Sequence, residues 1–346
     1  MEQEHKRRVR YKGTHPVRFE DKYKEHNPQK YADDVEKIIG KGKTPAGTHI
    51  PIMVGEILDF LQIKPGQVGY DATLGYGGHS GKMLEKLCGQ GHLYATDVDV
   101  IESAKTVERL ANAGFGPEIF TLKNMNFSQL DQVAPDNKFD FVLADLGVSS
   151  MQIDNPSRGF TYKQDGPLDL RLNPTAGVTA AQRLKELDEG EIAGMLFENS
   201  DEPYAEQIAK MVIRTYKKGE QIETTKQLAA VIEKALVELA KVKDEDEIKK
   251  ACKRTFQALR IDVNSEFEVL YQFLDKLPTV MKPGGRIAIL TFHSGEDRLV
   301  KKAFKDGLKA GIYSDVCKEP VRPTGEECFR NPRAHSTKLR WAVVAE

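Results

Sequence analysis

The chain has 346 residues, of which 40% are hydrophobic and 30% charged, and its formal net charge is −1. These values are typical of a globular protein with one large domain or a domain carrying an insertion, and the balanced charge gives no evidence for a polyanionic partner. No stretch approaches the about 18 consecutive apolar residues of a membrane-spanning helix, and the charged amino terminus does not resemble a signal sequence. We therefore expect no membrane partner.

Four cysteines lie far apart in the sequence, at Cys88, Cys252, Cys317 and Cys328. Such spacing favours reduced thiols in a cytoplasmic protein over a disulfide framework. Cys317, Cys328 and His335 follow a Cys-x10-Cys-x6-His spacing that matches no standard zinc site, so we expect no metal.

The first 46 residues hold twelve Lys/Arg against eight Asp/Glu. Residues 1–46 are predicted to form a basic amino-terminal arm that is partly disordered, with one weak helical stretch near Asp33–Ile39. The arm either engages phosphates or is a solvated tail.

From Pro51 onward the hydrophobic spacing changes several times between helical and strand periods. A helix is predicted from Pro51 to Leu61, and strands then alternate with helices, as a parallel sheet requires. The predicted strands are Val68–Ala72, Leu93–Asp97, Glu118–Lys123 and Phe139–Leu146, and the helices between them are Ser80–Cys88 and Val100–Ala113.

The alternation stops at about residue 155 and resumes after residue 260. The helices expected between them are Ala180–Leu187, Glu191–Glu198, Glu202–Tyr216 and Thr225–Leu239. The expected remainder is a helix at Asn264–Met281, a turn at Lys282–Gly285, a strand at Arg286–Phe292, a helix at Glu296–Leu308, and weaker strands at Ile312–Cys317 and Leu339–Val344. We predict an α/β core of residues 47–154 and 261–346, with 155–260 as a helical insertion that shapes the substrate site. Alternatively, the insertion is a module for dimerisation in a homodimer.

A glycine-rich turn follows the first predicted strand, within residues 69–80. Asp71 ends that strand, and Asp97 ends the next strand about 20 residues later, where it can bind ribose hydroxyls. The glycines do not follow G-x-G-x-x-G, which disfavours a dinucleotide and favours a nucleoside without phosphate, such as S-adenosylmethionine. The alternative is an ordinary strand–turn–helix corner.

Two further segments are expected on the same edge of the sheet, Asp145–Ser150 and Thr291–Asp297. Asp145 closes a buried strand, so its carboxylate must be hydrogen-bonded or face a ligand. In the other segment Ser294 is predicted to cap a helix, with Asp297 at the capping-box distance. His293 is either a core or rim histidine or a catalytic one.

Seven segments, in order, resemble the ribosomal small-subunit methyltransferase H family across residues 49–345. They are HIPIMVGEIL (49–58), DATLGYGGHS (71–80), DLGVSSMQID (145–154), RGFTYKQDGPLDLRL (158–172), RTFQALRIDVNSE (254–266), GGRIAILTFHSGEDRLVK (284–301) and NPRAHSTKLR (331–340). The additional arm suggests a second-type paralogue. The chain departs from the family pattern at Gly295, where the family has leucine, and this lies in the expected substrate region.

The resemblance implies a class I methyltransferase fold, a Rossmann-like and mostly parallel sheet, with S-adenosylmethionine as cofactor. It also implies methyl transfer to the exocyclic N4 of a cytidine in 16S ribosomal RNA near the decoding centre. The partner is then 16S ribosomal RNA or the small ribosomal subunit. The family's cofactor contacts correspond here to Gly77, Gly78, His79, Asp97, Phe127, Asp145 and Gln152.

A cytosine N4 is a poor nucleophile, so an acceptor is needed for its amino protons. We hypothesise that Asp145 or Ser149, with backbone carbonyls of the same loop, supplies it. Candidates for substrate contact are Arg158, Phe160, Arg171, Arg260 and His293, with Arg254, Arg333 and Arg340 as further phosphate contacts. For each arginine the alternative is an ion pair, as between Arg171 and Asp169, and for Phe160 it is a place in the core of the insertion.

Two other functions are compatible with these motifs. One is a class I methyltransferase acting on another RNA site or on a protein. The other is a non-catalytic ribosome-assembly factor that binds cofactor and RNA. The intact glycine turn, Asp97 and Asp145 argue against the second.

Overall fold

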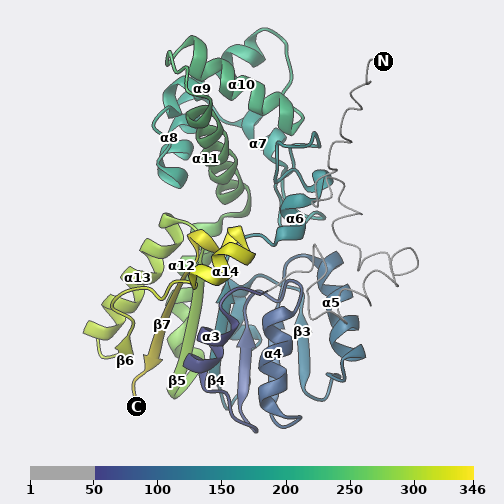
Figure 1. The fold of residues 1–346 in the computed structure, drawn as a ribbon, viewed down its shortest axis with the longest axis vertical. Helices are drawn as coiled ribbons and strands as arrows, with labels where there is room; N and C mark the ends of the chain where they lie inside the picture. The colour runs from purple at the N-terminus through teal and green to yellow at the C-terminus, as the bar shows by residue number, and fades with distance from the viewer. Residues whose placement is uncertain (1–50) are drawn as a thin grey trace, which may run out of the picture. The chain divides into compact units, whose positions relative to one another are not determined.

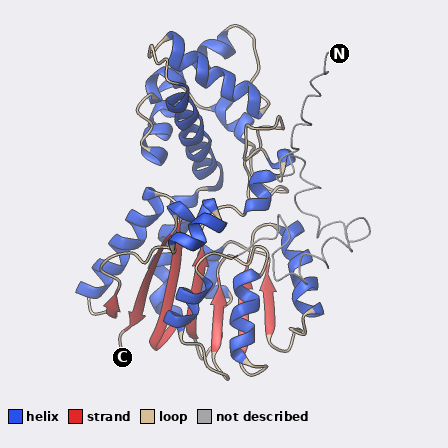
Figure 2. Ribbon diagram, in the orientation of Figure 1, coloured by secondary structure: helices blue, strands red, loops and turns tan. Residues whose placement is uncertain are grey.

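The computed structural model describes residues 51–346, so the predicted arm at 1–46 and its helical stretch lie outside the described residues. Seven strands form one sheet (Figures 1 and 2). They are β1 (Val68–Asp71), β2 (His92–Thr96), β3 (Phe120–Lys123), β4 (Phe139–Asp145), β5 (Met281–Thr291), β6 (Tyr313–Val316) and β7 (Lys338–Val344).

The strand order across the sheet is β3-β2-β1-β4-β5-β7-β6. Strands β1 to β5 are parallel, whereas β7 is antiparallel to both β5 and β6. The prediction of a mostly parallel α/β sheet is therefore confirmed. The order reverses between β1 and β4, and such a switch point opens a crevice at the carboxyl ends of the strands.

Helices cover both faces of the sheet (Figure 2). On one face α3 (Val54–Leu61), α4 (Gly78–Leu87) and α5 (Val100–Asn112) contribute to one buried hydrophobic cluster. On the other, α12 (Glu266–Lys276) and α13 (Ser294–Lys309) pack with Phe139 and Ile287 of the sheet. Each strand residue alternates between these two cores, which explains the nearly continuous apolar runs of the central strands.

The residues between β4 and α12 form a third hydrophobic cluster of their own. Its helices are α7 (Ala180–Glu186), α8 (Glu189–Ser200), α9 (Ala205–Lys217), α10 (Thr225–Glu238) and α11 (Glu245–Asn264). Contacts run from α8 to α9 and α11, and from α10 to α9 and α11. The division of the chain into a core and an insertion domain stays a prediction.

The helix expected at Asn264–Met281 was wrong in its extent. The backbone of Ser265 is left-handed, with φ 49°, and it both ends α11 and begins α12. A 3-10 turn with proline, η4 (Leu277–Val280), follows. A residue at positive φ cannot continue an α-helix, so the chain changes direction there.

The turn expected at Lys282–Gly285 lies inside β5, which begins at Met281 instead of Arg286. Met281 pairs with Phe139, but Arg286 pairs with Phe141, so the chain between them bulges out of the ladder. Gly284 takes φ 70° in this bulge. Helix α11 was not among the predicted helices. Two short helices, α6 (Ser150–Asp154) and α14 (Gly325–Arg330), were also not predicted, because they are too short for a helical period. Among residues 51–346, no helix has both the length and the apolar character needed to cross a membrane.

Candidate functional site

Most of the predicted cofactor residues lie beyond the carboxyl ends of β1, β2 and β4, around the switch point of the sheet, and Phe127 follows β3. The glycine turn connects β1 to α4. Gly77 has φ 74° and is the residue before the helix, and a Cβ on it would lie 2.7 Å from Cγ2 of Thr106. The Thr106 hydroxyl donates to the Gly75 carbonyl at 2.6 Å, which fixes the turn against α5. Glycine is therefore required here for both backbone conformation and space.

Asp71, at the end of β1, is fully engaged within the protein. Its carboxylate accepts hydrogen bonds from the Ser80 hydroxyl at 2.6 Å and from the Thr73 amide at 3.1 Å. Burial raises the pKa of this carboxyl, although both hydrogen bonds oppose the rise. Asp71 therefore holds the strand and the following helix in place.

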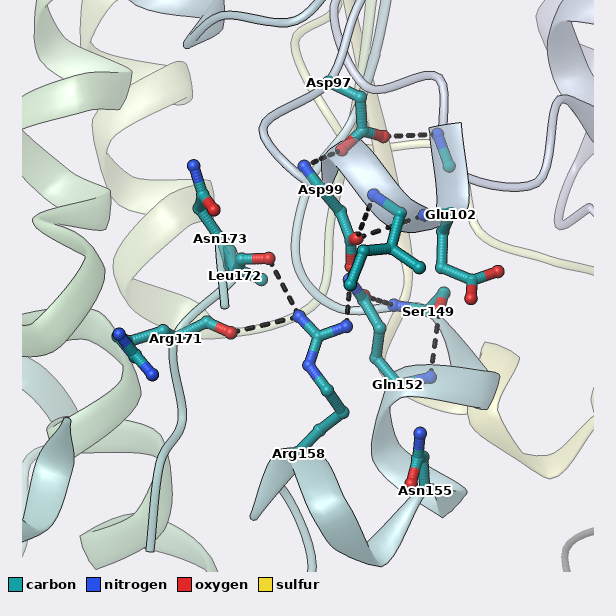
Figure 3. Close-up of polar contacts among 12 residues, drawn as sticks. Asp97, Asp99, Glu102, Ser149, Gln152, Asn155, Arg158, Arg171, Leu172 and Asn173 are labelled. Carbon is teal, nitrogen blue, oxygen red and sulfur yellow. Dashed lines mark hydrogen bonds and ion pairs between the residues drawn. The ribbon is translucent and has the colours of Figure 1, made fainter. Parts of the chain in front are cut away.

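Asp97, at the end of β2, accepts hydrogen bonds from two backbone amides. The Gly75 amide donates to Oδ2 at 2.7 Å and the Asp99 amide donates to Oδ1 at 2.8 Å (Figure 3). Burial raises the pKa of Asp97 to about 6, against the effect of these two bonds. Further donors, such as ribose hydroxyls, would stabilise the charged carboxylate.

Asp145, at the end of β4, has one carboxylate oxygen engaged and one free. His79 Nδ1 lies 3.4 Å from Oδ2, and the other ring nitrogen of His79 lies 2.9 Å from the Ile52 carbonyl oxygen. Burial lowers the pKa of His79, but the hydrogen bond and charge of Asp145 outweigh it and the net shift is upward. Oδ1 of Asp145 is buried and has no hydrogen-bond partner among the described residues. A buried acceptor without a partner is costly, so this oxygen is suited to a ligand donor.

Asp99 connects the cofactor region to the start of the insertion (Figure 3). Its side chain is 2% exposed and caps α5 through Oδ1, which accepts from the Ile101 and Glu102 amides. Its Oδ2 accepts from Gln152 Nε2 at 3.1 Å and from Arg158 Nη1 at 2.6 Å. Asp99 was not among the residues predicted to contact cofactor or substrate, although an aspartate directly before a helix was an available signal for its capping role.

Ser149 and Gln152 form a capping box at the start of α6. The Ser149 hydroxyl accepts from the Gln152 amide at 3.2 Å, and the Gln152 side-chain oxygen accepts from the Ser149 amide at 2.9 Å. The structure thus gives Ser149 a capping role, and its catalytic role stays a prediction. Phe127, in η2 (Phe127–Gln132), is half-buried and packs edge-on against Phe273.

The arginines predicted to contact substrate are held within the protein. Arg158 binds Asp99 and also donates from Nη2 to the carbonyls of Arg171 and Leu172, at 3.1 and 2.8 Å. The alternative weighed for the others, an ion pair, is the one observed: Arg171 with Asp169, Arg254 with Glu202 and Glu247, Arg260 with Glu266, Arg333 with Asp154, and Arg340 with Asp297. Phe160 packs against the core of the insertion, and its ring centre lies 5.9 Å from the Arg158 guanidinium carbon.

His293, and not Ser294, caps α13. Its Nδ1 accepts from the Glu296 amide at 3.5 Å in a capping box, because the strand extends to Thr291 and the helix begins directly at Ser294. Glu296 Oε1 lies 3.1 Å from His293 Nε2. Ligand atoms of Glu266, His293 and Glu296 lie within 4.8 Å of one another, but both Glu266 oxygens accept from Arg260. The guanidinium already balances this charge, which disfavours a cation there.

A sheet in this order, with carboxylates ending β1, β2 and β4 around a glycine turn, defines a class I S-adenosylmethionine-dependent methyltransferase. The MraW methylase family model matches residues 46–344, and the chain belongs to that family.

Several curated relatives span nearly the whole chain. Ribosomal RNA small subunit methyltransferase H 1 of Agathobacter rectalis is 63% identical over 100% of this chain and 99% of its own length. Ribosomal RNA small subunit methyltransferase H 2 of Alkaliphilus metalliredigens is 58% identical over 99% of each chain. The unnumbered methyltransferase H of Koribacter versatilis is 40% identical and covers 86% of this chain and 94% of its own. A solved rRNA methylase from Streptococcus thermophilus covers 86% of this chain and 99% of its own at 13% identity and a TM-score of 0.41, too slight a likeness to carry an argument.

The protein is therefore an enzyme whose cofactor is S-adenosylmethionine. Two features of the site fit that molecule. The unpartnered Oδ1 of Asp145 can accept a hydrogen bond, and the carboxylate of Asp97, which accepts from two backbone amides, can accept further hydrogen bonds from ribose hydroxyls.

Proposed function

We propose that this protein transfers a methyl group from S-adenosylmethionine to the exocyclic N4 of a cytidine in 16S ribosomal RNA, near the decoding centre. Identity of 63% along its full length to a ribosomal RNA small subunit methyltransferase carries this proposal. The substrate is the 16S RNA or the small subunit that contains it, and the reaction takes place in the cytoplasm. A homodimer stays an untested prediction.

The cofactor supplies an electrophilic methyl group on a sulfonium, and the protein must align the acceptor nitrogen with it. We assign the acceptor for the N4 protons to Asp145, whose Oδ1 is free while His79 holds Oδ2. The Thr73 hydroxyl accepts from the Asp145 amide at 2.7 Å, so the backbone of this residue is fixed as well. A carboxylate with one oxygen anchored and one free is positioned to accept a proton as charge develops.

The experiment is mass mapping of modified cytidines in small-subunit RNA from strains with and without the gene. Loss of one N4-methyl group on deletion, restored by the wild-type gene, is the expected result. An unchanged cytidine map with a missing methyl group elsewhere would instead indicate another RNA site or a protein substrate. An assembly factor without turnover would give unchanged maps and no incorporation of labelled methyl groups by the purified protein.

Variants of the two hypothesised catalytic residues separate their roles. Asp145→Asn should lower the rate of methyl transfer by at least about 100-fold, the scale of general base catalysis. Ser149→Ala should instead lower the stability of α6 by about 1 kcal/mol, the cost of a lost cap. Wild-type transfer rates in both variants, with cofactor still bound, would remove Asp145 and Ser149 from the mechanism.

A further inference from the structure

The arginines expected to contact RNA are not free to bind an anion. Those side chains are taken up by carboxylates or carbonyls, as described above. One group of unpaired cations instead lies on residues 155–260, at the carboxyl end of α9 and at Lys234 of α10.

A cleft of about 380 Å³ opens there, which we call the α9–α10 cleft. Its cations are Arg214, Lys217, Lys218 and Lys234, and all four are exposed. None of the four forms an ion pair with any residue in the range 51–346. Two carboxylates, Glu220 and Glu238, also line the cleft, and Met211 and Thr215 contribute to its wall.

Four cations against two carboxylates leave the cleft with an excess of positive charge. A concave surface with an excess of one charge concentrates the electrostatic potential and attracts counter-ions of the opposite sign. An unpaired arginine offers five donors in a fork that matches a phosphate group, and lysines add point charges. The chemistry of the cleft therefore fits phosphodiester oxygens.

Helix electrostatics accounts for only part of this cluster. Arg214 and Lys217 lie in the last turn of α9, where a cation offsets the partial negative charge of the helix end. Lys234 belongs to α10 and lies outside its last turn, which contains no basic residue. A separate helix thus adds its charge to the same hollow.

We infer that the α9–α10 cleft binds the phosphate backbone of the substrate RNA, as a contact additional to the cofactor site. This inference rests on the proposed function and deepens it. Because α9 and α10 pack against α8 and α11, the cleft belongs to the insertion and is built without residues of the sheet. An enzyme with such a contact distinguishes a structured RNA from a free nucleoside.

The test compares two double variants that remove the same charge. Arg214→Gln with Lys218→Gln alters the cleft, and Lys301→Gln with Lys305→Gln alters exposed, unpaired lysines of α13. Binding of the purified full-length proteins to 16S RNA and to isolated small subunits is measured by filter retention between roughly 50 and 400 mM KCl, a range over which counterion release weakens binding. Calorimetry with S-adenosylhomocysteine and thermal unfolding serve as folding controls.

The cleft variant should bind RNA about tenfold more weakly at low salt. The slope of log Kd against log salt should fall by about 1.5, since each lost phosphate contact removes about 0.7 to 0.9. Cofactor affinity and unfolding temperature should match those of the control. Equal RNA affinities and slopes in the two double variants would overturn the inference, as would a loss confined to assembled subunits, which indicates an acidic protein partner. Absence of methyl transfer by the wild type would overturn the proposed function instead.

Discussion

At the residue scale, the ionisation of Asp97 couples cofactor binding to pH. Burial places the pKa of Asp97 at about 6 in the folded protein, above its ordinary 3.8. Because a raised carboxyl pKa means that the folded state binds the proton more tightly, protonation of Asp97 favours folding. Its contribution to stability is therefore present at low pH and is lost as pH rises through about 6.

Cofactor affinity should change in the opposite direction. Ribose hydroxyls that donate to Asp97 favour the charged form, so affinity for S-adenosylhomocysteine should fall about tenfold between pH 7 and pH 5. Calorimetry across this range measures the effect. Asp97→Asn should bind more weakly and show a flat profile, and a wild-type profile that is equally flat would rule out Asp97 as the ribose contact.

Arg158 is the second residue whose replacement is informative, because its buried partner Asp99 would lose its counter-ion. Arg158→Gln leaves the 2% exposed Asp99 without its cation, and breaking such a pair costs about 3 kcal/mol. Thermal unfolding should show this loss. Arg158→Lys should recover part of the stability, since it keeps the charge but cannot reach Asp99 and both carbonyls together. An Arg158→Gln protein with wild-type stability would contradict the ion pair.

At the element scale, the pairing of β1 with β4 depends on Gly69. A Cβ on this glycine would lie 2.1 Å from two ring carbons of Phe141 on the neighbouring strand. Gly69→Ala should therefore lower the free energy of unfolding by about 1 to 3 kcal/mol, as overpacked cores do. Gly55→Ala is the control: it lies exposed in α3 with no atom within 4 Å of the added Cβ, and should be neutral or stabilising by up to about 1 kcal/mol. Equal denaturant midpoints for both variants would contradict this view of the sheet.

Elements with strong periodicity were predicted from the sequence to within a few residues. Strand β4 and helix α10 were expected at Phe139–Leu146 and Thr225–Leu239, and lie at Phe139–Asp145 and Thr225–Glu238. Helix α11 was missed, although Ile248, Cys252 and Phe256 follow a helical period. The start of α12 at Glu266 lies close to the expected Asn264, but the positive φ of Ser265 between the two helices has no signal in the sequence. The bulge in β5 was read as a turn because Lys282–Gly285 has turn composition, and only the pairing partners reveal the strand.

The sequence predicted where the site residues lie on the sheet, but not which side chains they pair with. Carboxylates at strand ends had to converge once the sheet was parallel, so Asp71, Asp97 and Asp145 could be placed on one rim. The pairing of Arg158 with Asp99 joins residues 59 apart in sequence, and no local pattern specifies it. The same holds for Arg333 and Asp154, which are 179 residues apart. Arg260 and Glu266 are only six residues apart, but they lie on two helices separated by the positive φ of Ser265.

At the scale of the whole molecule, the described residues contain three hydrophobic clusters, two beside the sheet and one within the insertion. Ligand binding stabilises only the segments whose local unfolding releases the ligand. At a ligand concentration of 100 times Kd this stabilisation is about 2.7 kcal/mol. S-adenosylhomocysteine should therefore slow amide hydrogen exchange in β1, β2, β4 and α6, and leave α9 and α10 unchanged. Hydrogen-exchange mass spectrometry with and without ligand checks this. Equal protection of α9 and α10 would mean that all three clusters open together.

The single carboxylate of Asp99 has a consequence for protein engineering. A helical module such as residues 155–260 could be exchanged between methylase scaffolds to change which nucleic acid is modified. In a recipient scaffold without an acid directly before the helix equivalent to α5, Arg158 of the module would have no carboxylate with which to form its ion pair. A chimera should therefore carry over the acid from the donor scaffold along with the module, although the two are far apart in the gene.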